Sequence, residues 1–137
     1  ARTDAAANEG LAGAIARAQA YVAAGADMIF AEALGSLDEY RQFASAVPAP
    51  VLANLTEFGK TPLFTVGQLR DAGIAMALYP LSAFRAMSAA AQRVYETVRR
   101  EGTQASLTSA MQTRDELYAV LDYHRYEEKL DQLFRPS

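Results

Sequence analysis

The stretch Val51-Leu52-Ala53-Asn54-Leu55-Thr56 is a short apolar run that ends in polar residues unsuited to a protein core. Met28-Ile29-Phe30-Ala31-Glu32 ends in a carboxylate, and Ala1-Arg2-Thr3-Asp4 ends in charged residues. A fourth run, Ile74-Ala75-Met76-Ala77-Leu78-Tyr79-Pro80, ends in an aromatic residue and a proline. Because segments with helical periodicity lie between these runs, the sequence predicts alternating strands and helices, with chemistry at the carboxyl ends of the strands.

This alternation is typical of a (β/α)8 barrel, which builds its active site from the ends of several strands and needs roughly 250 residues. The chain has 137 residues, and it begins at a strand end without an initiator Met or a signal-like segment. We therefore expect an α/β fold that is a partial (β/α)8 TIM-type barrel, seen from the end of its fifth strand onward. Residues 1–102 would form the second half of the barrel, and residues 103–137 a carboxyl-terminal helical tail.

Composition argues against several classes of function. The net charge is −3 and the thirteen Lys and Arg residues are dispersed, so we expect neither nucleic-acid nor membrane binding. No apolar stretch approaches the roughly 20 residues that span a bilayer. The chain has no cysteine, which excludes a disulfide framework and a thiolate metal site within it. We expect a cytoplasmic protein.

Residues typical of helix ends divide the chain further. A first helix should run from about Asn8 to Ala24 and end at Gly25, and a second should open with a capping box of Ser36 and Glu39. Thr65 with Gln68, and Thr113 with Glu116, are further capping boxes. The last of these should open one helix that continues to about Phe134.

Another helix should begin with Ser82 as its cap and end at Gly102. Its inner face should carry Met87, Ala90, Ala91, Val94 and Val98.

Taken in order, the strand-end residues resemble the isocitrate lyase and phosphoenolpyruvate mutase superfamily, and more narrowly its 2-methylisocitrate lyase family. The matching segments include Ala-Arg-Thr-Asp-Ala at 1–5, Leu-Ala-Asn-Leu-Thr-Glu-Phe-Gly at 52–59, Met-Ala-Leu-Tyr-Pro-Leu-Ser-Ala-Phe-Arg-Ala-Met at 76–87, Met-Gln-Thr-Arg at 111–114 and Tyr-Glu-Glu-Lys-Leu at 126–130. The resemblance covers essentially the whole chain.

The resemblance implies an Mg²⁺-dependent lyase that cleaves the tricarboxylate 2-methylisocitrate to pyruvate and succinate in the methylcitrate cycle of propionate catabolism. It places the cysteine acid and the main metal ligands in an amino-terminal half of the barrel, outside this chain. The chain alone would then hold no catalytic residue and be inactive. The resemblance also implies a homotetramer in which tail helices are exchanged between subunits.

Arg2 and Glu32 are the first candidate site residues. Arg2 would grip a substrate carboxylate through two hydrogen bonds, although a salt bridge with Asp4 or Glu32 is the alternative. Glu32 would contact substrate or hold Mg²⁺ through a water molecule, because Mg²⁺ keeps several waters. Otherwise it is a paired glutamate at the barrel mouth.

Asn54 and Thr56 lie two residues apart and should point to the same face of a strand. The resemblance favours ligand binding, with help from the backbone N–H of Leu55, over roles in a turn and a helix cap. Arg85, on the first turn of a helix, and Arg114, on the first turn of the tail helix, are expected to contact substrate by the same resemblance. The pattern alone would place both arginines on the surface.

The remaining candidates are less specific. Phe30, Leu78 and Pro80 would form an apolar wall beside the substrate's methyl group, or simply pack in the core. His124, the single histidine, is predicted to be structural, and Glu57 is either a lid residue or solvated. Two alternatives stay open for the chain: a related enzyme, such as an oxaloacetate decarboxylase or a phosphonate-processing enzyme, and a non-catalytic structural fragment.

Overall fold

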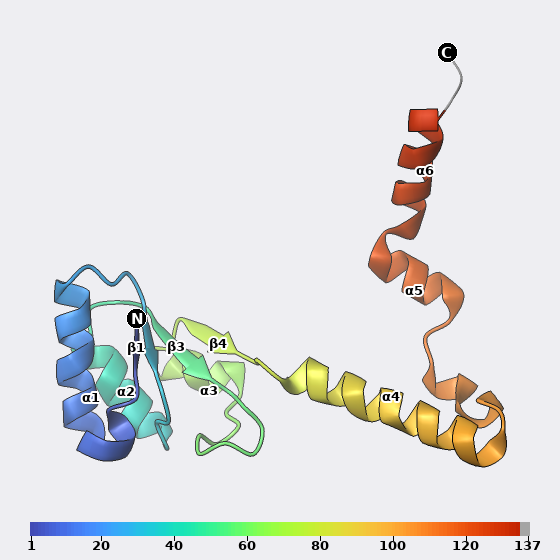
Figure 1. Ribbon diagram of the computed structural model, residues 1–137. Helices are drawn as coiled ribbons and strands as arrows, with labels where there is room; N and C mark the ends of the chain where they lie inside the picture. The colour runs from blue at the N-terminus through green and yellow to red at the C-terminus, as the bar shows by residue number, and fades with distance from the viewer. Residues whose placement is uncertain (135–137) are drawn as a thin grey trace. The chain divides into compact units, whose positions relative to one another are not determined.

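The computed structural model describes residues 1–134 and contains one sheet of four parallel strands in the order β1-β2-β3-β4 (Figure 1). The strands are β1 (Arg2–Thr3), β2 (Ile29–Ala31), β3 (Val51–Asn54) and β4 (Met76–Leu78). A helix follows each strand: α1 (Ala6–Ala23), α2 (Leu37–Ala46), α3 (Val66–Asp71) and α4 (Ser82–Glu101). The predicted alternation of strands and helices is confirmed. The chain divides into two compact units, residues 1–89 and the part from Ala90 onward, and we describe each by itself.

The two faces of the sheet differ in burial. Side chains alternate between faces along each strand. Thr3, Ile29, Ala31, Val51 and Ala53 are buried on the face that α1 covers, since α1 contacts β1, β2 and α2. The other face is less buried within the described residues and carries the candidate site residues.

Strand register aligns side chains on that second face. Arg2 pairs with Phe30, Phe30 with Leu52, and Asn54 with Leu78. Parallel strands run in the same direction, so their carboxyl ends meet at one edge of the sheet. The sheet therefore brings together strand-end residues that lie far apart in the sequence.

The ends of α1 depart in part from the prediction. The helix begins at Ala6, two residues before the predicted start, and it contains a break at Gly10 with φ 72° and ψ −178°. Glycine reaches this conformation without the steric penalty of a side chain. The predicted end is confirmed, because Gly25 follows the helix with φ 102°.

Two of the three predicted capping boxes are complete, Thr65 with Gln68 and Thr113 with Glu116. For the third predicted capping box, Ser36 with Glu39, one of the two expected hydrogen bonds is wrong. Ser36 Oγ accepts from the backbone N–H of Glu39 at 3.1 Å, but Glu39 Oε2 accepts from the N–H of Gly35 at 2.5 Å. The carboxylate thus binds the backbone one residue before the cap.

The prediction that Ser82 caps α4 is also wrong. Ser82 is the first residue of α4, and its hydroxyl donates to Glu57 in the loop after β3. The expected inner face of α4 is not buried within the described residues, where Met87, Ala90, Ala91 and Val98 are exposed. These residues find no apolar core in that part of the chain, although α4 ends as predicted before Gly102.

The second unit holds the last part of α4, a 3-10 helix η1 (Ala105–Ala110) and the helices α5 (Arg114–Leu121) and α6 (Tyr123–Phe134). The prediction of a single helix from Arg114 to Phe134 is wrong, because Asp122 adopts a left-handed conformation with φ 52°. Tyr118 and Tyr123 stack across this break, with ring centroids 4.3 Å apart. Among the helices described here, none has the length and apolar character needed to cross a membrane.

Candidate functional site

The first unit collects most of the predicted site residues at the carboxyl edge of the sheet. Arg2 belongs to β1, Glu32 directly follows β2, and Asn54 ends β3. Arg85 lies on the first turn of α4, where its backbone N–H donates to Leu81 O at 2.8 Å. Two guanidinium groups, a carboxylate and an amide therefore come from four consecutive βα units.

Arg2 is held by two carboxylates. Its Nη2 lies 2.6 Å from Asp4 Oδ1 and 3.6 Å from Glu32 Oε2, and its Nε donates to Asp4 at 3.1 Å. The hydrogen bonding to Asp4 is the largest cause that raises the pKa of Arg2 above its usual value. The guanidinium also lies over the Phe30 ring, 5.1 Å from its centroid. The salt-bridge alternative is thus present, and substrate contact by Arg2 stays a prediction.

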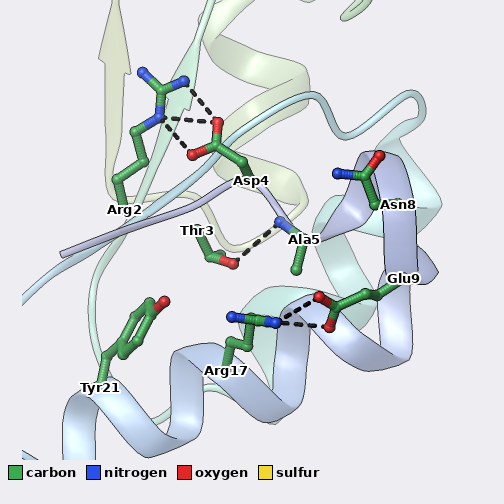
Figure 2. Close-up of a pocket in the computed structure, with 8 residues that line it drawn as sticks. All are labelled: Arg2, Thr3, Asp4, Ala5, Asn8, Glu9, Arg17 and Tyr21. Atoms are coloured by element: carbon green, nitrogen blue, oxygen red, sulfur yellow. Dashed lines mark hydrogen bonds and ion pairs between the residues drawn. The ribbon is translucent and has the colours of Figure 1, made fainter.

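Beside Arg2 the surface forms an open hollow of about 260 Å³, shown with its lining side chains in Figure 2. A second ion pair lines this hollow: Arg17 Nη2 lies 2.5 Å from Glu9 Oε1. In an unbroken helix, residues eight apart are too distant for this contact. The break at Gly10 brings them together, and the sequence analysis missed both residues because it did not predict that break.

Asn54 and Thr56 interact as their spacing predicts. Thr56 Oγ1 donates to Asn54 Oδ1 at 3.1 Å, and both side chains are half-buried. The bond uses the amide oxygen as the acceptor. Within residues 1–134 no partner is found for the Asn54 NH₂, which can therefore donate to an oxygen of a ligand.

The prediction for Leu55 needs a correction. Its backbone N–H donates to Leu78 O at 2.8 Å, so the group is already engaged between β3 and β4. The Leu55 side chain is 1% exposed and belongs to the core. The Leu55 N–H is therefore not free to donate a hydrogen bond to a ligand.

Arg85 lies close to the loop after β3. Its Nε is 3.8 Å from Glu57 Oε2, and its guanidinium lies over the Phe58 ring, 5.2 Å from the centroid. Phe58 itself has a positive φ of 62° and is 94% exposed. The neighbours of Arg85 are therefore Glu57, for which the sequence left a lid role or solvation open, and Phe58, for which it gave no role.

The three residues of the predicted apolar wall differ in position. Phe30 is half-buried on the sheet face that carries Arg2, and Leu78 is exposed on the same face beside Asn54. Pro80 is exposed in the connection between β4 and α4. Core packing does not account for Leu78 and Pro80 within the described residues.

Arg114 and His124 belong to the second unit, so their relation to the strand ends is a prediction. Arg114 is the first residue of α5 and is exposed. His124 Nδ1 lies 3.1 Å from Glu127 Oε2, and the imidazole packs edge-on against Tyr118 and Tyr123. These contacts give His124 a local role within α6 and beside α5.

A metal ion needs several ligands at one point. Among residues 1–134, no group of three or more His, Cys, Asp or Glu side chains is placed to hold one. Glu32 and Asp4 instead face the Arg2 guanidinium. The described residues therefore do not form a metal site of their own, and we derive no step through a metal from them.

Parallel strands joined by helices, with polar side chains at the carboxyl ends of the strands, are the arrangement expected for part of an α/β barrel. A model of the phosphoenolpyruvate phosphomutase family matches residues 1–99, and the chain belongs to this family. The 2-methylisocitrate lyase of Escherichia coli K12 is 64% identical over 137 residues, all of this chain and 46% of that protein. The chain spans about half the length of the curated relatives it matches.

Comparison with solved structures supports the same fold. The crystal structure of 2,3-dimethylmalate lyase, a PEP mutase/isocitrate lyase superfamily member, aligns with a TM-score of 0.82 at 28% identity, over 96% of this chain and 47% of that one. A phosphonopyruvate hydrolase in complex with oxalate and Mg²⁺ aligns with a TM-score of 0.76 at 25% identity, over 97% of this chain and 47% of that one. The predicted resemblance and fold class, a partial (β/α)8 barrel, are confirmed.

Proposed function

We propose that this chain is part of a 2-methylisocitrate lyase, which splits 2-methylisocitrate into pyruvate and succinate in the methylcitrate cycle of propionate catabolism. The observation that carries the proposal is the convergence of Arg2, Arg85 and the Asn54–Thr56 pair at one edge of the sheet. Identity of 64% to a 2-methylisocitrate lyase supports the choice of substrate. The active form would be a longer polypeptide, called here the full-length enzyme, that supplies the rest of the barrel.

The proposed roles follow from charge and geometry. Arg2 and Arg85 bind carboxylates of the substrate, and the Asn54 NH₂, oriented by Thr56, donates to a carboxylate oxygen. Held at several points, the substrate cannot turn away from the reactive geometry. Glu32 contacts the substrate or a water bound to the metal. The general acid, a cysteine, lies outside this chain.

Phe30, Leu78 and Pro80 supply an apolar wall for the methyl group that distinguishes 2-methylisocitrate from isocitrate. Such a contact is worth about 1–3 kcal/mol of discrimination. The full-length enzyme should therefore prefer the methylated substrate without excluding isocitrate.

The complex of the related phosphonopyruvate hydrolase with Mg²⁺ supports a magnesium-dependent enzyme, whose metal ligands would come from outside the described residues. We also propose a cytoplasmic homotetramer. Residues 1–102 would belong to the barrel, and the tail from residue 103 would dock on a neighbouring subunit. That exchange would bring Arg114 to an active-site mouth.

The test measures 2-oxo acid release with Mg²⁺: pyruvate from 2-methylisocitrate, 2,3-dimethylmalate, oxaloacetate and phosphonopyruvate, and glyoxylate from isocitrate, whose product lacks the methyl group. The full-length enzyme should use 2-methylisocitrate with the highest kcat/KM, and the 137-residue chain alone should be inactive. Activity should return if the chain is mixed with the missing amino-terminal part. Preference for oxaloacetate or phosphonopyruvate would favour the related enzymes instead, and no turnover of any compound would favour a non-catalytic protein.

A further inference from the structure

The loop after β3 makes an unusual contact with the start of α4. Glu57 accepts a hydrogen bond from Ser82 Oγ through its Oε1. Its other oxygen, Oε2, is buried and has no hydrogen-bond partner within the described residues. That oxygen lies 3.8 Å from Nε of Arg85. A buried carboxylate oxygen without a hydrogen bond costs free energy of folding. A functional reason is therefore expected for its place beside the Arg85 cation.

Phe58 completes the surroundings of Arg85. Its ring lies under the guanidinium although its backbone adopts a positive φ of 62°, which is unfavourable for an aromatic residue. The turn is closed by a hydrogen bond from Gly59 N to Thr56 O at 3.2 Å. The loop therefore presents a carboxylate and an aromatic face to Arg85 from adjacent positions.

The two site arginines differ in how their carboxylate neighbours hold them. Arg2 uses Nε and Nη2 to donate hydrogen bonds to Asp4, so a substrate must compete for those donors. Arg85 is attracted by Glu57, but 3.8 Å is too long for a hydrogen bond. Within residues 1–134 its guanidinium donors stay available. Glu57 can therefore orient the cation without occupying the fork that would bind a carboxylate.

We propose that Glu57 is a positioning residue, which together with Ser82 and Phe58 fixes the Arg85 guanidinium for a carboxylate of the substrate. The inference rests on the proposed role of Arg85. The Ser82 hydrogen bond, as the largest cause, lowers the pKa of Glu57 below its usual 4.5, so the group accepts from Ser82 as a carboxylate. Ser82 thus sets the place of Glu57.

The experiment is a double-mutant cycle in the full-length enzyme. Glu57→Gln should raise KM about tenfold and change kcat less than about twofold, because it weakens binding in the ground and transition states alike. Ser82→Ala, which removes the donor to Glu57, should raise KM about threefold. In an Arg85→Ala background, Glu57→Gln should change KM less than about twofold, because the residue through which it acts is gone.

Asp71→Asn is the matched control. Asp71 pairs with Arg70 on the exposed surface in the last turn of α3, the helix that leads into the amino end of β4 and so ends at the opposite edge of the sheet, and KM should stay unchanged. An unaltered KM in Glu57→Gln, or an equal effect with and without Arg85, would overturn the inference.

Binding of succinate, followed by calorimetry for the same variants, separates this inference from the proposed function. If the wild type does not cleave 2-methylisocitrate but the cycle still shows coupling for succinate, the function is wrong and the positioning role stands. If succinate binding shows no coupling, or no binding occurs in an enzyme that also lacks lyase activity, the positioning role is wrong as well.

Discussion

Thr56 Oγ1 donates a 3.1 Å hydrogen bond to Oδ1 of Asn54, two residues earlier on the chain. In this arrangement the amide oxygen of Asn54 accepts and its NH₂ group is left to donate to a ligand. The hydrogen bond holds the Asn54 side chain in place beside Thr56. Thr56 thereby positions the donor that we propose for a substrate carboxylate.

Thr56→Val should therefore lower kcat/KM of the full-length enzyme for 2-methylisocitrate by about tenfold or more, since a buried or half-buried hydrogen bond lost at a ligand site costs about 1–3 kcal/mol. Thr56→Ser keeps the hydroxyl and should retain most of the activity. Steady-state kinetics of the two variants decide the matter. Equal losses would indicate that the methyl group, and not the hydroxyl, is what the site requires.

Arg2→Ala should reduce kcat/KM on the order of 10²-fold or more, a loss of about 2–5 kcal/mol from an unpaired substrate carboxylate in a partly desolvated site. His124→Ala is the comparison, because the ion pair and aromatic contacts of His124 are local ones with Glu127, Tyr118 and Tyr123. It should change kcat/KM less than about threefold. The opposite order of effects would reverse our ranking of the two residues.

The strand ends were predictable because parallel strands with one covered face leave a clear pattern of apolar runs followed by polar residues. Local hydrogen bonding also made the Thr65 and Thr113 capping boxes predictable. Both signals lie within a few residues of sequence. The same pattern places Arg2, Glu32 and Asn54 at one edge of the sheet, because each of them belongs to the polar end of an apolar run.

Contacts between distant segments were not predictable in this way. Ser82 has a residue type typical of a helix cap, but Glu57, 25 residues earlier, takes its hydroxyl instead. The break at Asp122 was missed because the apolar pattern continues through it, while the backbone turns left-handed at one residue. The Leu55 N–H was assigned to a ligand by the family resemblance, and the sequence gives no sign of its hydrogen bond to Leu78 O.

The loop after β3 is anchored to the connection after β2 by Thr61. Its buried hydroxyl donates to Leu34 O at 2.8 Å. Thr61→Val keeps the shape but leaves this carbonyl without its partner, so the free energy of unfolding should fall by about 1–3 kcal/mol. Thr61→Ser should lose less. Urea unfolding of the full-length enzyme and both variants measures the difference, and an unchanged midpoint for Thr61→Val would contradict the anchor.

The capping box of α5 should make the tail sensitive to acid. Glu116 accepts hydrogen bonds from the backbone N–H of Thr113 at 2.7 Å and from its hydroxyl at 2.9 Å. The backbone bond is the larger cause, and both lower the pKa of Glu116 from its usual 4.5. A lowered folded-state pKa means that the stabilisation is complete above pH 4.5 and is lost as the pH falls through the folded value.

Titration of the Glu116 carboxyl by NMR should give a midpoint below 4.5 in the wild type. Thr113→Ala removes the hydroxyl donor, although the backbone N–H remains. Its midpoint should therefore move back toward the usual value without reaching it. A wild-type midpoint at or above 4.5 would show that the box does not hold Glu116 in solution.

The tail helices α5 and α6 expose more apolar surface than is usual for helices surrounded by solvent. The exposed residues of α5 and α6 include Leu117, Val120, Leu121, Tyr126, Leu130, Leu133 and Phe134. Exposed apolar groups in such number are typical of a surface that binds another protein surface. We expect the partner surface, to which the tail helices bind, to lie on a neighbouring subunit of the full-length enzyme.

Truncation of the full-length enzyme after Gly102 should therefore lower both the oligomeric order and the activity. Light scattering coupled to gel filtration, with parallel measurement of kcat/KM, compares the truncated and intact proteins. Arg114→Ala in the intact protein is the matched variant, because it removes only the proposed ligand contact. It should lower kcat/KM while the tetramer persists. A truncated protein that stays tetrameric and fully active would show that the tail is dispensable, and the proposed role of Arg114 would be wrong with it.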